Sequence, residues 1–213
     1  MKFNTLLLLL AFLLTACSQP DQPTVGLYVA IKRGDLDQIE RHIYWKTDIN
    51  QNNVDGNSPL HESARAGRTV ISEVLLDHGA MVNKLNRNNK TPLQLALENG
   101  RTQIAKMLID KYRADFEPTL SLFDSVIAGV SDRDVFHFLA NRNADFNAIN
   151  DAGFSPLALA IAERNRVQAK HLIQYGADVN LAISNGKTPL DLARDNRDTD
   201  IEQLLLANGA GTN

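Results

Sequence analysis

The chain has 213 residues, of which 44% are hydrophobic, and a formal net charge of −3 at pH 7. This length suits one elongated domain or one ordinary globular domain. The mildly acidic balance argues against a nucleic-acid binder, which normally carries a basic face. The single cysteine, Cys17, leaves no disulfide framework and no cysteine–metal site, so packing alone must hold the fold.

The N-terminus has the layout of a secretory signal. Lys2 precedes an apolar run from Leu6 to Leu14, which is far shorter than the ~20 residues of a membrane-spanning helix. The following Leu14-Thr15-Ala16-Cys17 resembles the bacterial lipobox. The resemblance implies that residues 1–16 are removed, that Cys17 is diacylglyceryl-modified on sulfur, and that the new N-terminus is acylated. The alternative is soluble secretory cleavage after Ala16, but it would put Leu14 where a small residue is preferred.

The lipobox also predicts where the mature protein lies. Three acyl chains on one residue would hold it to a bilayer without a spanning helix, because each buried methylene contributes ~0.8 kcal/mol. Ser18 follows the cysteine where aspartate commonly marks inner-membrane retention, so we expect the outer membrane, facing the periplasm. Residues 17–24, the lipidated cysteine and a polar, proline-bearing stretch, are expected to form a tether that lifts the folded part off the membrane.

Beyond residue 24 one pattern recurs. The segments NSPLHESARAG, KTPLQLALENG, FSPLALAIAER and KTPLDLARDNR begin at residues 57, 90, 154 and 187, with intervals of 33, 64 and 33 between their Ser/Thr-Pro pairs. The interval of 64 is close to two repeats, with residues 120–147 as the unit between, and residues 25–50 form a unit that starts 33 residues before Ser58. Such a period indicates a repeat architecture.

The residues that recur in these segments each suit a particular place in a helix or turn. Ser or Thr caps a helix, and proline suits its first position. Gly67 and Gly100 permit a tight turn into a second helix, which residues such as Gly79 end in the left-handed conformation; Asn143 can do the same. Asn- and Gly-rich tips at 52–57, 150–154 and 183–187 suit turns with positive φ. Each unit therefore predicts two short antiparallel helices and a hairpin.

This unit resembles the ankyrin repeat, and the resemblance covers essentially all of residues 25–213. We predict an all-α repeat solenoid of about six units, with polar units at the two ends. The fourth unit departs most from the pattern. The hairpin before it is about four residues short, Ser121 stands at the proline position, and about two residues are added around Val130-Ser131. A break in stacking or curvature is therefore predicted over residues 113–133.

The histidines do not predict a catalytic or metal centre. His61 occupies the histidine of the T-P-L-H motif, which the resemblance assigns to hydrogen bonds within and between hairpins, and Arg65 stands where a zinc-protease motif needs its second histidine. His42, His137 and His171 fall on second helices of separate units. We therefore predict no enzyme, metal or cofactor. A pocket joining His137 to carboxylates in the irregular fourth unit would revive an enzymatic reading.

The resemblance implies protein binding on a concave surface of hairpin tips and first helices. In ankyrin repeats the contacts gather at the tip positions before the T-P-L motif and near the end of the first helix. Those positions here are Asp55, Asn57, Arg65, Arg87, Lys90, Glu98, Asp151, Phe154, Glu163, Asn185 and Lys187. Phe154 is the most informative, since its counterparts are polar; it is either an exposed anchor or covered by the fourth unit. Trp45 is expected to pack under the first end cap, with a role in partner contact as the second alternative.

The sequence thus predicts a monomeric, lipid-anchored scaffold, adaptor or regulator that binds a protein of the bacterial envelope. One alternative is an inhibitor or immunity-like protector of a periplasmic enzyme or toxin. Another is a host-directed role, against which the lipid anchor counts. The candidate surface mixes both signs of charge, so neither a strongly acidic nor a strongly basic ligand is predicted, and no nucleic acid.

Overall fold

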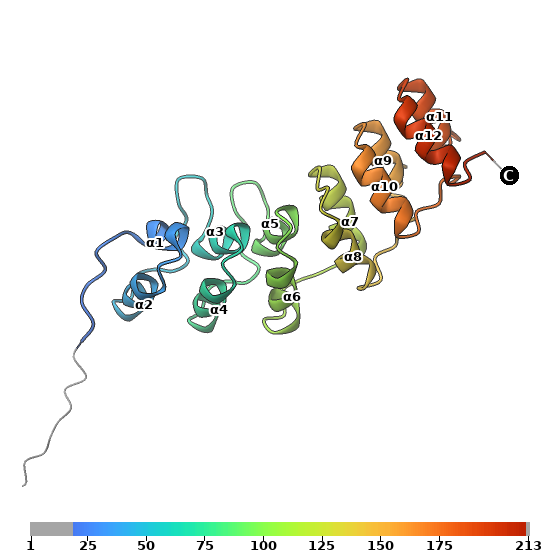
Figure 1. Ribbon diagram of the computed structural model, residues 1–213. Coiled ribbons are helices and arrows are strands. Elements are labelled where there is room, and N and C mark those ends of the chain that lie inside the picture. The colour runs from blue at the N-terminus through green and yellow to red at the C-terminus, as the bar shows by residue number, and fades with distance from the viewer. Residues whose placement is uncertain (1–18, 212–213) are drawn as a thin grey trace, which may run out of the picture.

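A computed structural model describes residues 19–211, so Cys17 and the lipobox lie outside the described residues. Within that range the chain forms twelve helices in six consecutive pairs and no strand (Figure 1). The first helices are α1 (Leu27–Arg33), α3 (Pro59–Ala66), α5 (Pro92–Glu98), α7 (Pro118–Ile127), α9 (Pro156–Ala162) and α11 (Pro189–Asp195). The second helices are α2 (Leu36–Tyr44), α4 (Thr69–Asp77), α6 (Thr102–Asp110), α8 (Arg133–Ala140), α10 (Arg166–Gln174) and α12 (Thr199–Ala207). The predicted all-α solenoid of about six units is confirmed.

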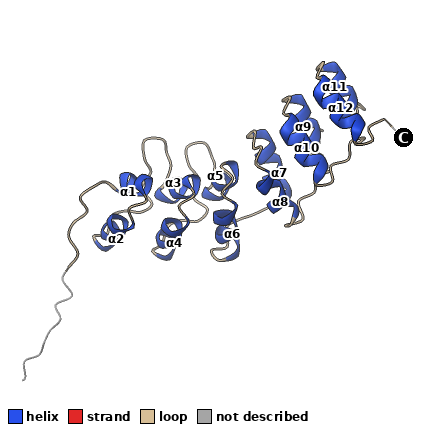
Figure 2. Cartoon of the chain, in the orientation of Figure 1, coloured by secondary structure: helices blue, strands red, loops and turns tan. Residues whose placement is uncertain are grey.

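The helices form two layers. Each first helix packs against the first helix of the next unit and against the second helix of its own unit, so the first helices line one side of the array and the second helices the other. Figure 2 shows that all remaining described segments are loops and turns. The predicted hairpins are therefore present as tips without β-strand pairing in residues 19–211.

The Ser/Thr-Pro pairs start the helices as expected. Ser58, Thr91, Ser155 and Thr188 each accept a hydrogen bond from a backbone N–H of the first turn, and proline follows each at the first helical position. Such a cap contributes about 1 kcal/mol to helix stability. In the second, third and sixth units the side chain of the third helical residue also accepts a hydrogen bond from the backbone N–H of the cap residue, which completes a capping box.

The core is a ladder of leucines between the layers. The second helices of units two to six each contribute one leucine with no exposed surface: Leu75, Leu108, Leu139, Leu172 and Leu205. The first helices add Leu60, Leu93, Leu157 and Leu190, which are at most 6% exposed. Burying one leucine stabilises the fold by about 1.5–3 kcal/mol. Because one pair of helices cannot bury this surface alone, stability depends on stacking between neighbours.

Helix α7 begins one turn earlier than the pattern predicted. Counting back from the turn residue Gly129 puts Ser121 at the proline position, yet the helix starts at Pro118, and the Glu117 carboxylate accepts a hydrogen bond from the N–H of Leu120 (2.9 Å). The prediction that Ser121 replaces the proline was therefore wrong, because the proline lies one turn upstream. The connection from α6, residues 111–117, is correspondingly short and forms no tip.

The fourth unit also carries the predicted extra residues. Val130 N–H donates to Ser125 O (3.0 Å), as Arg101 N–H does to Ala96 O (2.8 Å) in the third unit. Helix α6 then starts directly after Arg101, whereas α8 starts two residues further on, after Asp132. In Figure 1 the pairs from α1 to α6 form one row and those from α7 to α12 form a second row inclined to it. The change of direction falls within the predicted range.

The segment before α1 lies against the first unit. The Trp45 indole N–H donates to the carbonyls of Pro20 (3.2 Å) and Asp21 (3.3 Å), and Thr24 N–H donates to Gln38 Oε1 (2.8 Å). Over residues 19–24 the expected tether is thus attached to α2 and does not stand free of the repeats. No helix in residues 19–211 is long and apolar enough to span a membrane.

Candidate protein-binding surface

Four loops project as tips ahead of α3, α5, α9 and α11. In each, the N–H of the first residue donates to the carbonyl of the fifth at 2.8–3.0 Å. The fourth residue has positive φ and is glycine or asparagine, the two residue types expected to permit it: Gly56, Asn89, Gly153 and Gly186. The bonds join Asn53 to Asn57, Asn86 to Lys90, Asn150 to Phe154 and Ile183 to Lys187. This closure leaves the side chains of Asp55, Arg87, Asp151 and Asn185 exposed on the four tips.

The tips are also bonded to one another. Asn86 Nδ2 donates to Asn57 Oδ1 of the preceding tip (2.8 Å), and His61 Nε2 lies 2.9 Å from Lys90 O. The other ring nitrogen of His61 accepts from Ser58 N–H (3.2 Å), so the predicted role of His61 within and between hairpins is confirmed. Loops fixed in this way lose little further freedom when a partner binds.

Charged residues pair along the first helices. Lys90 Nζ lies 2.5 Å from Glu98 Oε1, and the equivalent Lys187 Nζ lies 2.7 Å from Asp195 Oδ2. The hydrogen bond to Asp195 raises the pKa of Lys187 above its usual value. These pairs join a tip to the end of its first helix and leave little net charge there.

In the second unit the carboxylate of Glu62 is the centre of the charged network. Burial alone would raise the pKa of Glu62, but hydrogen bonds from Arg65, Asn57 and Asn53 outweigh it and hold the pKa below its usual value. Arg65 Nη2 lies 2.6 Å from Glu62 Oε2, and Asn57 Nδ2 donates to Oε1 (2.8 Å). Asn57, a predicted contact residue, is therefore also part of the scaffold of its tip.

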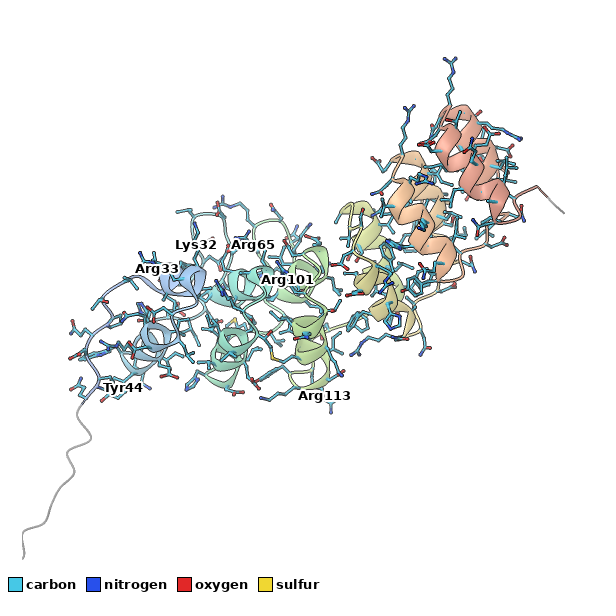
Figure 3. The ribbon with its side chains drawn as sticks, viewed as in Figure 1. Lys32, Arg33, Tyr44, Arg65, Arg101 and Arg113 are labelled. Atoms are coloured by element: carbon cyan, nitrogen blue, oxygen red, sulfur yellow. The ribbon has the colours of Figure 1, made fainter. Side chains whose placement is uncertain are left out.

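A groove of about 240 Å³ runs between α1, the first tip and α3. Its lining includes Tyr28, Lys32, Asp55, Glu62 and Arg65. Burial, followed by the negative charge of Glu62, raises the pKa of Tyr28 to about 12, so its hydroxyl stays protonated at pH 7 and donates to Asn57 O (2.8 Å). Figure 3 shows Lys32 and Arg65 on the side of the array that carries the tips. The inner surface of the first three units is therefore polar and mixed in charge.

The fourth and fifth units differ, because apolar residues replace these charges. Two residues before the turn into the second helix, the second, third and sixth units have Arg65, Glu98 and Asp195, whereas the fourth and fifth have Ile127 and Ala162. Ile127 is 68% exposed, and Ala162 is also exposed.

Two further apolar side chains extend this area. Leu120 is 60% exposed and lies two turns before Ile127 on the same face of α7. Between them on this face lies the half-buried Asp124, whose carboxylate accepts a hydrogen bond from Gln94 Nε2 (2.8 Å). Phe154, half-buried, precedes the neighbouring helix α9 and takes the place that Lys90 and Lys187 have in their units. Helices α7 and α9 pack side by side (Figure 1). We call Leu120, Ile127, Phe154 and Ala162 the apolar patch.

The predicted contact residues thus divide by exposure. Asp55, Arg65, Arg87, Asp151, Glu163, Asn185 and Lys187 are exposed, and Asn57, Lys90, Glu98 and Phe154 are half-buried. Phe154 is neither the fully exposed nor the fully covered residue that the sequence offered as alternatives. Leu120 and Ile127 were missed because the fourth unit lacks the T-P-L motif at the expected place. Counting back from Gly129 would have found Ile127.

His137 does share a groove with carboxylates. This groove of about 710 Å³ lies between α6 and α8, and its lining includes Asp110 and Asp134. Asp110, however, pairs with Arg142 (2.9 Å), and His137 Nε2 lies 2.9 Å from Asn141 Nδ2. In residues 19–211 no hydrogen bond joins His137 to a carboxylate, and no group of three His, Cys, Asp or Glu is placed to hold a metal. The groove thus brings His137 together with the carboxylates of Asp110 and Asp134 without joining them as an acid–base pair.

Comparison with known families decides the relationship. A family model described as ankyrin repeats in three copies matches residues 27–119 and again 124–213. The chain belongs to the ankyrin-repeat family. The gap between the two matches falls inside the lengthened helix α7. Proteins of this family are typically non-enzymatic modules that bind other proteins.

Individual relatives agree with this assignment. An ankyrin repeat protein of Rickettsia bellii (strain RML369-C) is 43% identical over 54 residues, which are 25% of this chain and only 32% of that protein. The crystal structure of the ankyrin repeat domain of Bcl-3 matches with a TM-score of 0.67 at 22% identity, and the match covers 89% of this chain and 88% of the Bcl-3 chain. A chain from the complex of the Bdellovibrio bacteriovorus predatory endopeptidase Bd0816 with the immunity protein Bd3460 has a TM-score of 0.65 at 23% identity, covering 87% and 99%. Both structures share the fold.

Proposed function

We propose that this ankyrin-repeat protein is a non-catalytic binding module, lipid-anchored in the bacterial envelope, that holds one protein partner on the inner surface of its fourth and fifth units. Its role is that of a scaffold, adaptor or regulator. The protein acts as a monomer, with the partner in contact with the apolar patch and with the charged tips on either side.

The apolar patch carries this proposal. Exposed apolar side chains are common singly on protein surfaces, but Ile127 and Ala162 stand where the second, third and sixth units have charged residues, and Phe154 stands where the third and sixth have lysine. Apolar side chains beside polar and charged ones are the usual composition of a protein interface, and the carboxylate of Asp124 within this patch is already hydrogen-bonded by Gln94. The candidate residues Asp151, Glu163, Asn185 and Lys187 provide the rim next to the patch.

The anchor rests on the sequence. Leu14-Thr15-Ala16-Cys17 follows an apolar run that is too short to span a bilayer, and Cys17 is the chain's only cysteine. Acylation there places the array at a membrane surface, and Ser18 favours the outer membrane over the inner one. Intact-mass measurement of the protein extracted from cells tests this point: loss of residues 1–16 with a triacyl increment supports it, and an unmodified Cys17 refutes it.

The partner site is tested by crosslinking in living cells. A photoreactive residue is placed at Ile127 or at Phe154, and mass spectrometry identifies the adducts. The matched control is Val167, an apolar residue that is 50% exposed on α10, in the outer layer. We expect one dominant protein to be captured from both patch positions and not from Val167. Equal capture from all three positions, or capture only from Val167, would refute the assignment.

A second candidate function is inhibition or immunity-like protection of a periplasmic enzyme or toxin. The observation in its favour is the fold shared with a chain of the endopeptidase–immunity protein complex, a likeness of fold alone. The two functions differ in the effect of deleting the gene. Loss of a scaffold removes an activity of the cell, whereas loss of an inhibitor releases one, such as peptidoglycan or protein cleavage in the periplasm.

A further inference from the structure

Two aromatic residues, Tyr44 and Trp45, lie at the C-terminal end of α2, close to the first described residues of the chain. Tyr44 and Trp45 are 50% and 37% exposed, and their rings meet edge to face with centroids 6.0 Å apart. They line a groove of about 710 Å³ together with Glu40, Ile43, Lys46 and Gln19, the first described residue, and with His78 at the end of α4 in the second unit. Figure 3 shows Tyr44 beside the point where the described chain begins. Most of the groove's lining surface is apolar, although it is open to solvent.

The chain that leads out of this groove is fixed in place. Besides the two hydrogen bonds from the Trp45 indole to Pro20 and Asp21, the Asp21 carboxylate lies 3.6 Å from Arg41 Nη1. At the other end of the segment Val25 packs against the core, and its carbonyl lies 2.7 Å from Nε2 of the buried His42. Residues 20–25 thus follow α2, and their N-terminal end stays at Trp45.

Chain length then limits how far Cys17 can be from the aromatic pair. Cys17 precedes Pro20 by three positions, and three steps along the chain span at most about 11 Å even when fully extended. Pro20 is itself hydrogen-bonded to Trp45. Acyl chains on Cys17 would therefore enter a bilayer within that distance of the Tyr44–Trp45 groove.

We propose that Tyr44 and Trp45 insert into the interfacial region of the membrane that holds the lipid anchor, so that the end of the first repeat rests on the bilayer. This inference relies on the proposed lipidation of Cys17. Tyrosine and tryptophan concentrate at membrane–water interfaces because their rings are apolar and one edge is polar. Glu40 and Lys46 beside them have opposite charges, so the surface fits a bilayer irrespective of headgroup charge.

The contact would orient the whole array. With the ends of α2 and α4 against the membrane, α11 and α12 lie at the other end of the array from this contact (Figure 1). The apolar patch on α7 and α9 would then lie away from the membrane surface, where a periplasmic protein can reach it. A free tether would give no such orientation.

The sequence offers a direct test, because Trp45 is the only tryptophan and Cys17 the only cysteine. The mature chain, beginning at Cys17, is coupled through that thiol to phosphatidylcholine vesicles containing a maleimide lipid, with or without bromine on the acyl chains near the headgroup. We expect Trp45 emission to shift to shorter wavelength on coupling, to lose most of its intensity in the brominated vesicles, and to be protected from iodide in the unbrominated ones.

The control moves the tryptophan. In a Trp45→Phe, Val167→Trp variant, the reporter lies on the exposed side of α10, and we expect no bromine quenching after the same coupling. Trp45 emission that is unchanged by brominated lipid and still quenched by iodide would overturn the proposal and leave the groove to another occupant, such as a protein. Coupling is chemical, so this result does not depend on whether cells lipidate Cys17, which the intact mass decides separately.

Discussion

Gly153 and Gly186 occupy the same place in two successive tips and have the same φ of +83°, but they differ in their surroundings. A Cβ on Gly153 would lie 1.9 Å from Ser184 Oγ and 2.5 Å from Ser184 Cβ, in the next tip. A Cβ on Gly186 would meet nothing within 4 Å. The first glycine is therefore required by close approach as well as by backbone conformation.

We predict that Gly186→Ala costs about 1–2 kcal/mol, the strain of a left-handed alanine. Gly153→Ala should cost a further 1–3 kcal/mol or so, because the two tips must separate. Urea unfolding followed by circular dichroism measures both. The added Ser184→Gly substitution should bring Gly153→Ala to the level of Gly186→Ala. Equal losses for the two single variants would show that the tips do not pack as described.

His61 makes stability depend on pH. Ser58 N–H donates to Nδ1, so Nδ1 must be unprotonated, and Nε2–H donates to Lys90 O. Burial, the largest effect, lowers the pKa of His61 below 6.5. Between that lowered pKa and 6.5 the unfolded chain binds more protons than the folded one. The contribution of His61 is therefore fully present above pH 6.5 and is lost as the pH falls toward the folded-state pKa.

The His61→Gln variant tests this linkage. Gln94 fills the same place in the third unit and completes its capping box, so glutamine fits the position. We expect the free energy of unfolding of the wild type to fall more between pH 7 and pH 5 than that of His61→Gln, as measured by urea titration at both values. The carboxylates and other histidines are common to both chains. Identical pH profiles would mean that His61 is not held neutral.

At the scale of the helices, the fourth unit depends on one side chain from the fifth. Gln168, on α10, has no exposed surface, and its Nε2 donates to the carbonyls of Val126 (3.1 Å), at the C-terminal end of α7, and of Val130 (2.8 Å), just after it. The second helices of the second, third and sixth units have Ile71, Ile104 and Ile201 at this position. The glutamine therefore compensates for the two added residues, which leave carbonyls inside the array.

We predict that Gln168→Ile, although it introduces the isoleucine of the second, third and sixth units, destabilises the protein by about 1–3 kcal/mol. It removes the donor to the buried carbonyls of Val130 and Val126, of which only Val126 keeps another, the N–H of Gly129 (3.0 Å). Thermal or urea unfolding gives the value. Gln174→Ile, at an exposed position of the same helix, should change stability by less than about 0.5 kcal/mol. A stabilising Gln168→Ile would mean that those carbonyls do not need the glutamine.

Local chemistry explains why most elements could be predicted from the sequence and a few could not. Cap-proline pairs such as Thr91-Pro92 and turn residues such as Gly67 act within a few positions, so the period alone places their helices. The start of helix α7 could not be predicted from the pattern, because its cap is Glu117 instead of Ser or Thr and the preceding connection has no tip. The roles of Gln168 and Trp45 depend on contacts with segments about 20 to 40 residues away, which no local pattern contains.

Across the whole molecule, the inner surface divides into a charged part and an apolar part. The first three units present paired charges such as Lys90 and Glu98, whereas α7 and α9 present Ile127 and Ala162. If the apolar patch provides most of the affinity, salt should have little effect. Raising the ionic strength from about 0.1 M to about 1 M shortens the Debye length from about 10 Å to about 3 Å.

We therefore predict that partner recovery on immobilised protein changes by less than about twofold over that range, as expected where charges set encounter rather than affinity. The comparison uses the partner identified from Ile127, washed at each salt concentration. A steep loss of recovery at high salt would assign the affinity to the charged tips.

The most direct test of the account combines one crosslinking probe with two substitutions. The probe stands at Phe154, and the background carries either Ile127→Asp, in the apolar patch, or Val167→Asp, on the outer face of α10. Both positions are at least half exposed, so neither change should alter stability by more than about 0.5 kcal/mol. The account predicts that the Phe154 adduct is lost with Ile127→Asp and kept with Val167→Asp. Equal adduct yields in the two backgrounds would contradict it.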